Sequence, residues 1–480
     1  MNNNNVHNHF TEQTVMFASI TKWILISSII GALIGVIVSF FLKFLEYCEE
    51  SRDLLPFDYY YTLPFALVIT VYIVKKFAPS AQGHGTEKVI EAVHKKSGKM
   101  NISVVPVKLV ATVITIFSGG SVGKEGPGAQ IGAAFASYVA TLFKFSNRDR
   151  KKMVICGISA GFASVFGTPL AGAIFGVEIL IVGALMYDIL LPSIVAGFSA
   201  FFVAKMFGIS YTYFDISFYT VFDFNYVLIA KILLAGIFFG LVADFIITTL
   251  RAIHNYANNL KMNYLLKAFL GGVLIVVLTL IVGDEYLGLG FETIKESLSS
   301  SFDDHENIPW YTFILKTIFT SLTLGFGGSG GVITPIFYVG ATSGNFFGYL
   351  VDGYIPLFAA LGFVSVLAGA TSAPIAAMIM AVELFGMNVA HYAALSIIIA
   401  FLMTGHRSVF PSQILSMKKS EALDVNLGQE IENTETTYTT KFFTNMSRII
   451  KIVYLKMRNK KAKKEETEDK PSEKSDETIK

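Results

Sequence analysis

Long apolar runs separated by short polar stretches fill the chain between residues 22 and 416. The first run, residues 23–44, has no charged residue before Lys43 and is long enough to cross a hydrocarbon layer of about 30 Å as a helix. It is too long for the apolar core of a cleaved signal peptide, and no small-residue cleavage site follows it. Apolar helices are predicted in the same way over residues 62–75, 103–117, 151–166, 169–187, 189–206, 227–249, 265–283, 311–326, 354–370, 372–386 and 388–404.

Two shorter, glycine-rich helices are predicted over residues 126–143 and 331–350. Several of the predicted helices are too short, or too interrupted by Gly and Pro, to cross a bilayer simply. A bilayer tolerates interrupted backbone only where it is buried in protein or lines a cavity. We therefore expect an all-α integral membrane protein of tilted and broken transmembrane helices, with its function at the breaks.

The composition supports a membrane protein, because 53% of the 480 residues are hydrophobic and only 15% are charged. The formal net charge of +2 gives no indication of a nucleic-acid partner. Cys48 and Cys156 lie far apart in or beside apolar segments, so we predict neither a disulfide nor a metal site.

The polar segments divide the chain into an N-terminal segment (1–21), a membrane domain (22–416) and a charged tail (417–480) whose end is expected to be disordered. Within the tail, residues 441–464 contain nine basic residues and no acidic one. This stretch fits a helix on an anionic leaflet and a solvated basic linker equally well. The basic tail and the sequence NRDRKK at 147–152 favour cytoplasmic termini in a prokaryotic plasma membrane.

An internal repeat becomes visible when the sequence is shifted by 208 positions. GGSVGKEGPGAQIG (119–132) then matches GGSGGVITPIFYVG (327–340) at six Gly, Ser or Pro positions, and TPLAGAIFGVEIL (168–180) resembles APIAAMIMAVEL (373–384) at a shift of 205. Glycine-rich membrane helices also resemble one another by composition alone. The preserved order of both motifs favours two related halves, roughly 22–206 and 227–416, with a transporter-type site where their interrupted segments meet.

The residue types of this motif indicate an anion site. Glycines before a helix start expose consecutive N–H groups, and a proline in the first turn gives up a donor that has no partner there. Free N–H groups and the positive end of the helix dipole favour an anion. Glu125 lies in this turn, so its ionised carboxylate can occupy the anion position and leave it on protonation. The alternative is a glutamate that merely caps the helix beside Lys124.

Three motifs occur in order: GHGTEKVIEAVH (83–94), GKEGP (123–127) and GGVITP (330–335). They resemble the anion-site motifs of the CLC chloride channels and transporters, over roughly residues 20–416. The resemblance implies a homodimer with one pore in each subunit, two inverted-topology halves, and Glu125 as the external gate that takes up a proton. By position it implies a chloride site lined by backbone N–H groups around Gly123, Lys124, Glu125, Val332 and Ile333.

The sequence departs from the family pattern at the central anion site. The family's first motif usually reads Gly-Ser-Gly-Ile-Pro, whereas His84 replaces the serine here, and we expect it to line the inner pore. It has three open roles: donating an N–H to the anion, pointing away, or titrating. A tyrosine of the family's final membrane helix is replaced by Phe410 or Pro411, neither of which donates a side-chain hydrogen bond.

The remaining features concern mechanism and substrate. Proton-coupled relatives often carry Glu-Glu after the proline of the later motif, but Glu178 is followed here by Ile179, so the internal proton acceptor is absent. This favours a passive chloride channel over a chloride/proton antiporter, in which protons would have to come through water or through another residue, with His84 as one candidate. Pro127 fits the chloride-conducting branches of the family better than the fluoride-exporting one.

Two rival classes remain. A metalloenzyme would use the spacing of His84, Glu87, Glu91 and His94, which can share one helix face. A cation-coupled solute carrier does not explain glycine-rich helix starts in both halves. We expect no enzymatic activity and no cofactor or metal, with chloride as the ligand and membrane lipid and a second copy of the chain as partners.

Overall fold

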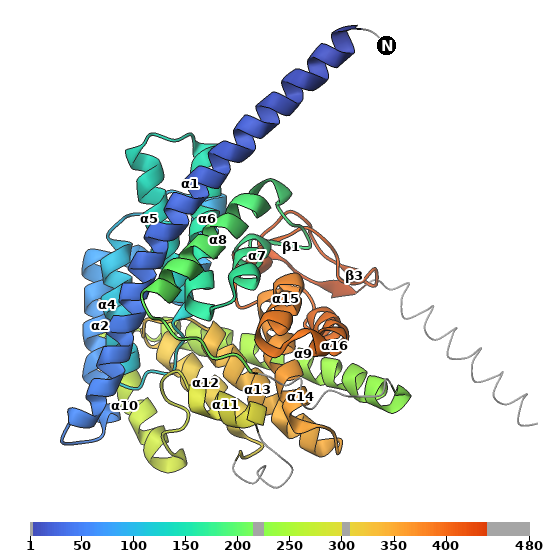
Figure 1. Cartoon of the computed structure of the whole chain (residues 1–480). Helices are drawn as coiled ribbons and strands as arrows, with labels where there is room; N and C mark the ends of the chain where they lie inside the picture. The colour runs from blue at the N-terminus through green and yellow to red at the C-terminus, as the bar shows by residue number, and fades with distance from the viewer. Residues whose placement is uncertain (1–2, 215–224, 300–307, 439–480) are drawn as a thin grey trace, which may run out of the picture.

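The computed structural model describes residues 3–214, 225–299 and 308–438, which are almost entirely helical (Figure 1). The first part of the chain contains α1 (Asn3–Glu50), α2 (Leu63–Phe77), α3 (Thr86–Lys95), α4 (Val104–Phe117), α5 (Glu125–Leu142), α6 (Asn147–Phe166), α7 (Pro169–Glu178) and α8 (Tyr187–Met206). The second contains α9 (Tyr226–Asn259), α10 (Tyr264–Val282), α11 (Phe291–Ser299), α12 (Thr312–Gly325), α13 (Ile333–Leu350), α14 (Ile355–Thr371), α15 (Pro374–Phe385) and α16 (Ala390–Met403).

The expected all-α membrane fold is confirmed. By length and composition, five helical stretches of the described chain can cross a membrane: α1, the segment Tyr59–Phe77 that includes α2, and helices α8, α9 and α10. Shorter apolar helices such as α7 and α12 fill the interior between them. This is a multi-pass integral membrane protein with many broken helices.

Predicted boundaries differ from the structure by more than a few residues in three helices. Helix α1 runs without a break from residue 3 through residue 22, and α9 extends ten residues beyond the predicted end at 249. The helix predicted over 169–187 is wrong in its second part, because α7 ends at Glu178 and the chain continues into the short strand β1 (Ile181–Val182). Gly183, with φ of +88°, turns the backbone away from a helical path at that point.

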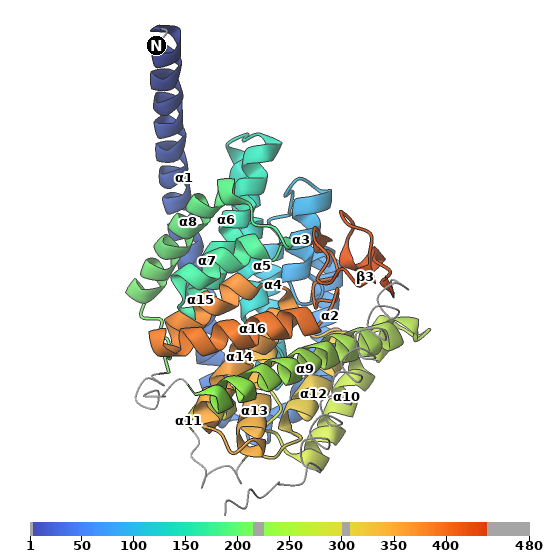
Figure 2. The ribbon, with the colours of Figure 1, turned by 90° about the vertical axis from the view of Figure 1, so that its right-hand side faces the viewer.

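The two halves repeat the same order of eight helices, so α1–α8 correspond to α9–α16. Corresponding neighbours pack alike: α5 packs on α6 as α13 does on α14, and α1 packs on α8 as α9 does on α16. Figure 2 shows the long α9 and α16 lying side by side in front of the body. The repeat predicted from the glycine motifs therefore extends through helices whose sequences show no visible similarity.

A pair of glutamates links the halves reciprocally. Glu178, at the end of α7, accepts hydrogen bonds from the first N–H groups of α15, at Ile375 (2.9 Å) and Ala376 (2.7 Å). Glu383, in the last turn of α15, accepts in return from Leu170 (3.1 Å) and Ala171 (2.8 Å) of α7. Each carboxylate satisfies two helix-terminal donors that have no partner within their own helix.

The described segment after α16, residues 404–438, contains no α-helix. Beyond Met403 it forms β2 (Ile414–Leu415), which pairs in parallel with β1. The start of the tail then folds back through β3 (Leu423–Asp424) and β4 (Thr437–Tyr438), and Glu430 forms an ion pair with Lys95 of α3 (2.9 Å). The basic stretch 441–464 lies outside the described residues.

The reciprocal caps predict a stability effect. Glu178→Gln should lower the thermal unfolding temperature in detergent, because the uncharged amide can accept from only one of the two N–H groups. The loss should be about 1–3 kcal/mol, the cost of an unsatisfied buried donor. Glu383→Gln is the symmetry-matched variant and should behave alike. Unchanged unfolding temperatures in both variants would show that the caps do not contribute to stability.

Candidate functional site: an anion pathway between two helix starts

The N-terminal ends of α5 and α13 meet at the junction of the two halves. Each is preceded by a glycine-rich loop, and the loops cross at Gly123 and Gly331. The Gly123 N–H donates to the Gly331 carbonyl oxygen (2.7 Å), and the Gly331 N–H donates to the Gly123 carbonyl oxygen (2.6 Å). The two motifs recognised in the sequence are thus in direct backbone contact.

Hydroxyl groups of each half fix the loop of the other half. The Ser121 N–H donates to the Thr323 hydroxyl (3.2 Å), and the Ser329 N–H donates to the Thr115 hydroxyl (3.1 Å). The serine side chains repeat the exchange, with Ser121 beside Thr320 (3.0 Å) and Ser329 beside Thr112 (3.2 Å). The partners in the two sets are separated by the same 208 positions as the glycine motifs. The positions of the two helix starts therefore depend on both halves together.

Glu125 is buried, with 2% of its surface exposed, and its carboxylate reaches across the junction. The Oε2 atom accepts hydrogen bonds from the N–H (3.2 Å) and the hydroxyl (2.5 Å) of Thr334, in the first turn of α13. The carboxylate thus occupies the donor end of the opposite helix. A side chain at Gly123 would exclude it, because a Cβ there would lie 2.5 Å from Oε2 and 2.6 Å from the Thr334 hydroxyl oxygen.

The other residues predicted around this junction have different roles. The Gly123 amide is engaged with Gly331, so it is not available to an anion, and the residue serves by allowing the close approach. The Lys124 ammonium lies 4.9 Å from the centre of the Phe291 ring rather than at the helix start. Val332 and Ile333 are buried at the beginning of α13, where the sequence placed them.

His84 and Phe410 come together from opposite ends of the chain. Their ring centres are 5.7 Å apart, and the Phe410 side chain is fully buried. The loop that carries His84 packs against the first turn of α5, where a Cβ at Gly126 would lie 2.2 Å from the His84 carbonyl oxygen. The His84 Nδ1 atom is buried and has no hydrogen-bond partner. The second predicted part of the site therefore adjoins the first.

Two buried lysines were missed in the sequence. Lys108 of α4 donates to the carbonyl oxygens of Ala81 (3.2 Å) and Gly83 (2.5 Å), in the loop before α3. Lys316, 208 positions later in α12, donates to the carbonyl oxygens of Tyr286 (3.1 Å) and Gly288 (2.9 Å), in the loop before α11. The sequence signal that could have revealed them is a single lysine at the same place in each of two apolar runs. Both ammonium groups are fully buried, and carbonyl oxygens satisfy their donors.

Thr334 was also missed, although it carries the only hydroxyl of the GGVITP motif. Its repeat position in the first half is Gly126, which has no side chain. The sequence alone gives no reason to pair Thr334 with Glu125, because the two residues are 209 positions apart. Their contact exists only because the two loops cross.

The position expected to supply an internal proton acceptor carries a buried, apolar side chain. The Ile179 side chain is fully buried, and its carbonyl oxygen accepts a hydrogen bond from the Gln413 side chain (2.9 Å). The same amide nitrogen donates to the Thr371 carbonyl oxygen (2.9 Å). Gln413 thus joins the end of α7, the end of α14 and the segment that carries Phe410.

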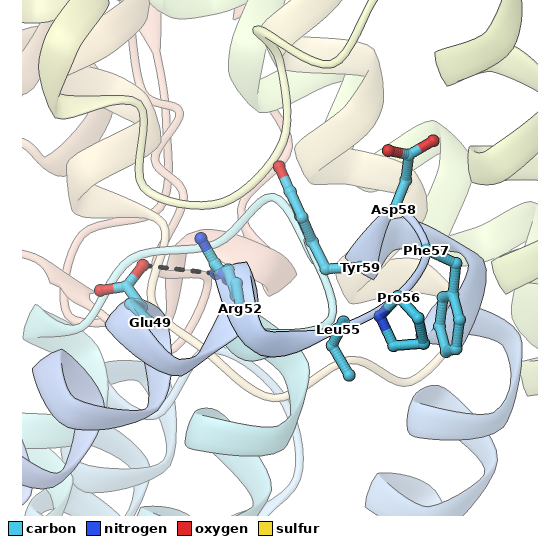
Figure 3. Close-up of a pocket in the computed structure, with 7 residues that line it drawn as sticks. All are labelled: Glu49, Arg52, Leu55, Pro56, Phe57, Asp58 and Tyr59. Carbon is cyan, nitrogen blue, oxygen red and sulfur yellow. Dashed lines mark ion pairs between the residues drawn. The ribbon is translucent and has the colours of Figure 1, made fainter.

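An open pocket of about 500 Å³ lies at the opposite end of α1 from the N-terminus (Figure 3). Arg52 and Tyr59 point into it, with the guanidinium 4.7 Å from the tyrosine ring centre, and Glu49 pairs with Arg52 at 3.4 Å. Arg52 also donates to the carbonyl oxygens of Ile116 and Phe117, at the end of α4. The pocket therefore borders the loop that leads to Gly123 but does not contain the helix junction.

The residues considered for a metal do not converge. His94 contacts the Leu180 carbonyl oxygen (2.9 Å), Glu91 pairs with Lys88 (2.9 Å), and Glu87 binds Ser412. Among the residues that the structure describes, no group of three or more His, Cys, Asp or Glu side chains is placed to hold a metal ion.

Fold and site together define a membrane protein whose two inverted halves bring helix N-termini to a buried glutamate. Residues 65–405 match the family described as voltage gated chloride channel. The chain is 34% identical over 418 residues to a chloride/fluoride channel protein of Pseudomonas syringae pv. tomato, covering 85% of this chain and 90% of that relative. This chain therefore belongs to the voltage-gated chloride channel family, the CLC family.

Solved structures agree with that assignment. A CLC-type fluoride/proton antiporter superposes with a TM-score of 0.77 at 28% identity, covering 82% of this chain and 98% of the other. A slow cyanobacterial Cl⁻/H⁺ antiporter has the same fold, with a TM-score of 0.67 at 20% identity over 80% of this chain and 94% of the other.

The Thr334 contact predicts a pH effect. Thr334→Val removes the hydroxyl donor while nearly keeping the volume, so the ionised Glu125 carboxylate is held less firmly at α13. A hydrogen bond to a charged group contributes about 1.5–3 kcal/mol, so the external pH of half-maximal anion flux should rise by roughly 1–2 units. Flux from proteoliposomes at a series of external pH values measures this, and an unshifted profile would contradict it.

Proposed function

We propose that this protein carries chloride across a membrane through a pathway within each subunit, with Glu125 as its gate. The observation that carries the proposal is the contact of Glu125 with the N–H and hydroxyl of Thr334. A carboxylate that occupies the donor end of a helix is placed where a permeant anion would bind. Protonation removes its charge, so the side chain leaves and the anion can enter.

Chloride is the first candidate ion, and fluoride is the second. Fluoride is a candidate because the Pseudomonas relative is named as a chloride/fluoride channel protein and the similar antiporter structure is a fluoride/proton antiporter. Pro127 favours chloride by resemblance to the chloride-conducting branches. At the central site, the Phe410 ring offers no hydrogen-bond donor to an anion. The His84 ring N–H group and the backbone amides near it would have to replace the water molecules that the anion loses.

We further propose a passive channel rather than an antiporter. The support is the fully buried, apolar Ile179 side chain, which cannot carry a proton at the position where proton-coupled relatives carry the internal glutamate. The family resemblance also supports a homodimer. The basic stretch 147–152 and the ion pair of Lys22 with Asp149 (3.6 Å) support a cytoplasmic location of the N-terminus, in a prokaryotic plasma membrane.

The transported ion can be tested directly. Proteoliposomes loaded with chloride or with fluoride should release chloride when an ionophore clamps the voltage, and release fluoride more slowly. Faster fluoride release would make fluoride the substrate. Sodium-dependent solute uptake without anion release would contradict the proposal and favour a cation-coupled carrier.

The gate is tested in the same liposomes with Glu125→Gln, which imitates the protonated side chain. Anion release should continue but lose its dependence on external pH, because the titrating group has gone. Glu292→Gln is the matched control, an exposed acidic residue next to Phe291 on α11. A folded Glu125→Gln protein with the wild-type pH response would show that Glu125 only caps a helix.

Channel and antiporter differ in their reversal potential. With an anion gradient across the membrane, a channel reverses at the equilibrium potential of that anion, with or without a pH gradient. An antiporter's reversal potential shifts with pH because protons cross in a fixed ratio. We expect no shift; a clear shift would overturn the channel assignment, and repeating it in His84→Ala would show whether His84 delivers the protons.

A further inference from the structure

The cytoplasmic face of the protein can be identified from its contacts. Lys22 near the start of the first membrane run pairs with Asp149, so that end of α1 lies beside the basic start of α6. After α3, a Cβ at Gly98 would lie 3.4 Å from the Lys151 Cα atom, which places the end of α3 on this face too. The Lys95–Glu430 ion pair adds the tail. This basic face is the cytoplasmic one under the excess of Lys and Arg.

The Glu125 junction lies toward the other face. Lys124 contacts Phe291, and the loop before Gly123 is bonded to Arg52 through the Phe117 carbonyl oxygen (3.0 Å). Arg52 follows Lys22 by 30 residues along an almost continuous helix, a distance of about 45 Å. The Glu125 junction and the cytoplasmic face therefore lie toward opposite ends of α1.

Glu87, in the first turn of α3, makes a contact that repeats the geometry of Glu125. Its Oε1 atom accepts hydrogen bonds from the backbone N–H (3.0 Å) and from the hydroxyl of Ser412. Glu125 accepts from the N–H and hydroxyl of Thr334 through one oxygen in the same way. In both cases a carboxylate in the first turn of one helix binds a hydroxyl residue on a distant segment.

The Glu87 contact lies next to the predicted central site. Ser412 follows Phe410 by two residues, and Glu87 follows His84 by three, so the contact joins the two walls that hold the facing rings. The backbone around Ser412 is held independently, because Ile431 donates to the Gln413 carbonyl oxygen (2.9 Å). We therefore assign any movement at this contact to the Glu87 side chain rather than to the segment that contains Ser412.

Unsatisfied polar atoms show that the contact is incomplete. The Glu87 Oε2 atom is buried and accepts no hydrogen bond, and the His84 Nδ1 atom nearby along the chain is buried without a partner as well. By contrast, Glu178 and Glu383, which act as caps, use both carboxylate oxygens. A buried carboxylate oxygen without a hydrogen-bond donor destabilises the ionised form of the side chain. Protonation of Glu87 and its release from Ser412 are therefore favoured.

We propose that Glu87 is a second gate, at the cytoplasmic end of the pathway, whose ionised carboxylate closes against Ser412 as Glu125 closes against Thr334. The proposal rests on the proposed anion transport. An acidic cytoplasm neutralises Glu87 and weakens a charge-assisted contact, so the Ser412 donors become available to an incoming anion.

Other charged groups face Glu87 and set the pH at which it titrates. Lys88 is its neighbour on α3, and Glu432 approaches from the segment after β3. Arg251 of α9 is influenced by both Glu87 and Glu432, and His254 of α9 is influenced by Glu432 and Lys88. Because these groups carry charges of both signs, they shift the pH at which the anion current responds. The group whose titration causes the response remains the Glu87 carboxyl.

The test records anion current in excised membrane patches, where the pH on each face is set separately. In the wild type, acidifying the cytoplasmic face should raise the current several-fold, and by no more than about tenfold per pH unit because a single carboxyl titrates. Glu87→Gln should abolish this response and keep the response to external pH, whereas Glu125→Gln should do the reverse. Glu91→Gln, one turn later on α3 and paired with Lys88, is the matched control.

A second variant and a second measurement separate gating from folding. Ser412→Ala removes one of the two donors and should reduce the cytoplasmic pH response without eliminating it. Hydrogen exchange of the peptide that contains Ser412 should be faster in Glu87→Gln than in the wild type at equal pH, while the rest of the chain is unchanged.

The outcomes distinguish the two proposals. If the wild type conducts anions and Glu87→Gln retains the full cytoplasmic pH response, the second gate is overturned and the proposed transport stands. If the wild type conducts no anion in either direction, the proposed function fails and the gate fails with it.

Discussion

The two hydrogen bonds between Gly123 and Gly331 are the contact on which the pathway depends, because they set how far apart the starts of α5 and α13 can lie. Neither residue has room for a Cβ, because a Cβ at Gly331 would lie 2.8 Å from the Gly126 nitrogen and one at Gly123 would lie 2.6 Å from the Thr334 hydroxyl oxygen. At that spacing one side chain, Glu125, reaches from the first turn of one helix to the first turn of the other. The hydroxyls of Thr115 and Thr323 satisfy neighbouring loop amides that would otherwise be buried without partners.

The buried glutamates have two different roles, which can be told apart by the geometry of their hydrogen bonds. Glu178 and Glu383 bind two N–H groups through two oxygens, so each is held as part of the framework. Glu125 and Glu87 bind a threonine or serine through one oxygen, which leaves less to break when the group is protonated. The difference follows from the groups that face each carboxylate. Glu178 and Glu383 face only backbone N–H groups of a helix start, whereas each proposed gate faces a residue that also has a hydroxyl group.

The buried lysines hold the loops that border the site. Lys108 and Lys316 bind carbonyl oxygens of the loops before α3 and α11, so they stabilise these loops. From the sequence, helix N-termini alone were expected at the site. The structure adds one buried lysine in each half, at equivalent positions of the repeat.

Much of this protein could be predicted from its sequence: the membrane class, most helices to within a few residues, and the two halves. Glu125, His84 and Phe410 were also singled out from the sequence, and their roles stay predictions. These follow from local signals, since apolar run length, glycine clusters and a charge within an apolar segment are visible without a fold. The partners of those residues could not be predicted. Thr334 lies 209 positions from Glu125, and Ser412 lies 325 positions from Glu87. The end of α7 was misplaced for the same reason, because β1 exists only through its pairing with β2. Residue type and spacing determined which groups are candidates for the chemistry, whereas the tertiary contacts between distant segments decided which hydrogen-bond donors each carboxylate meets.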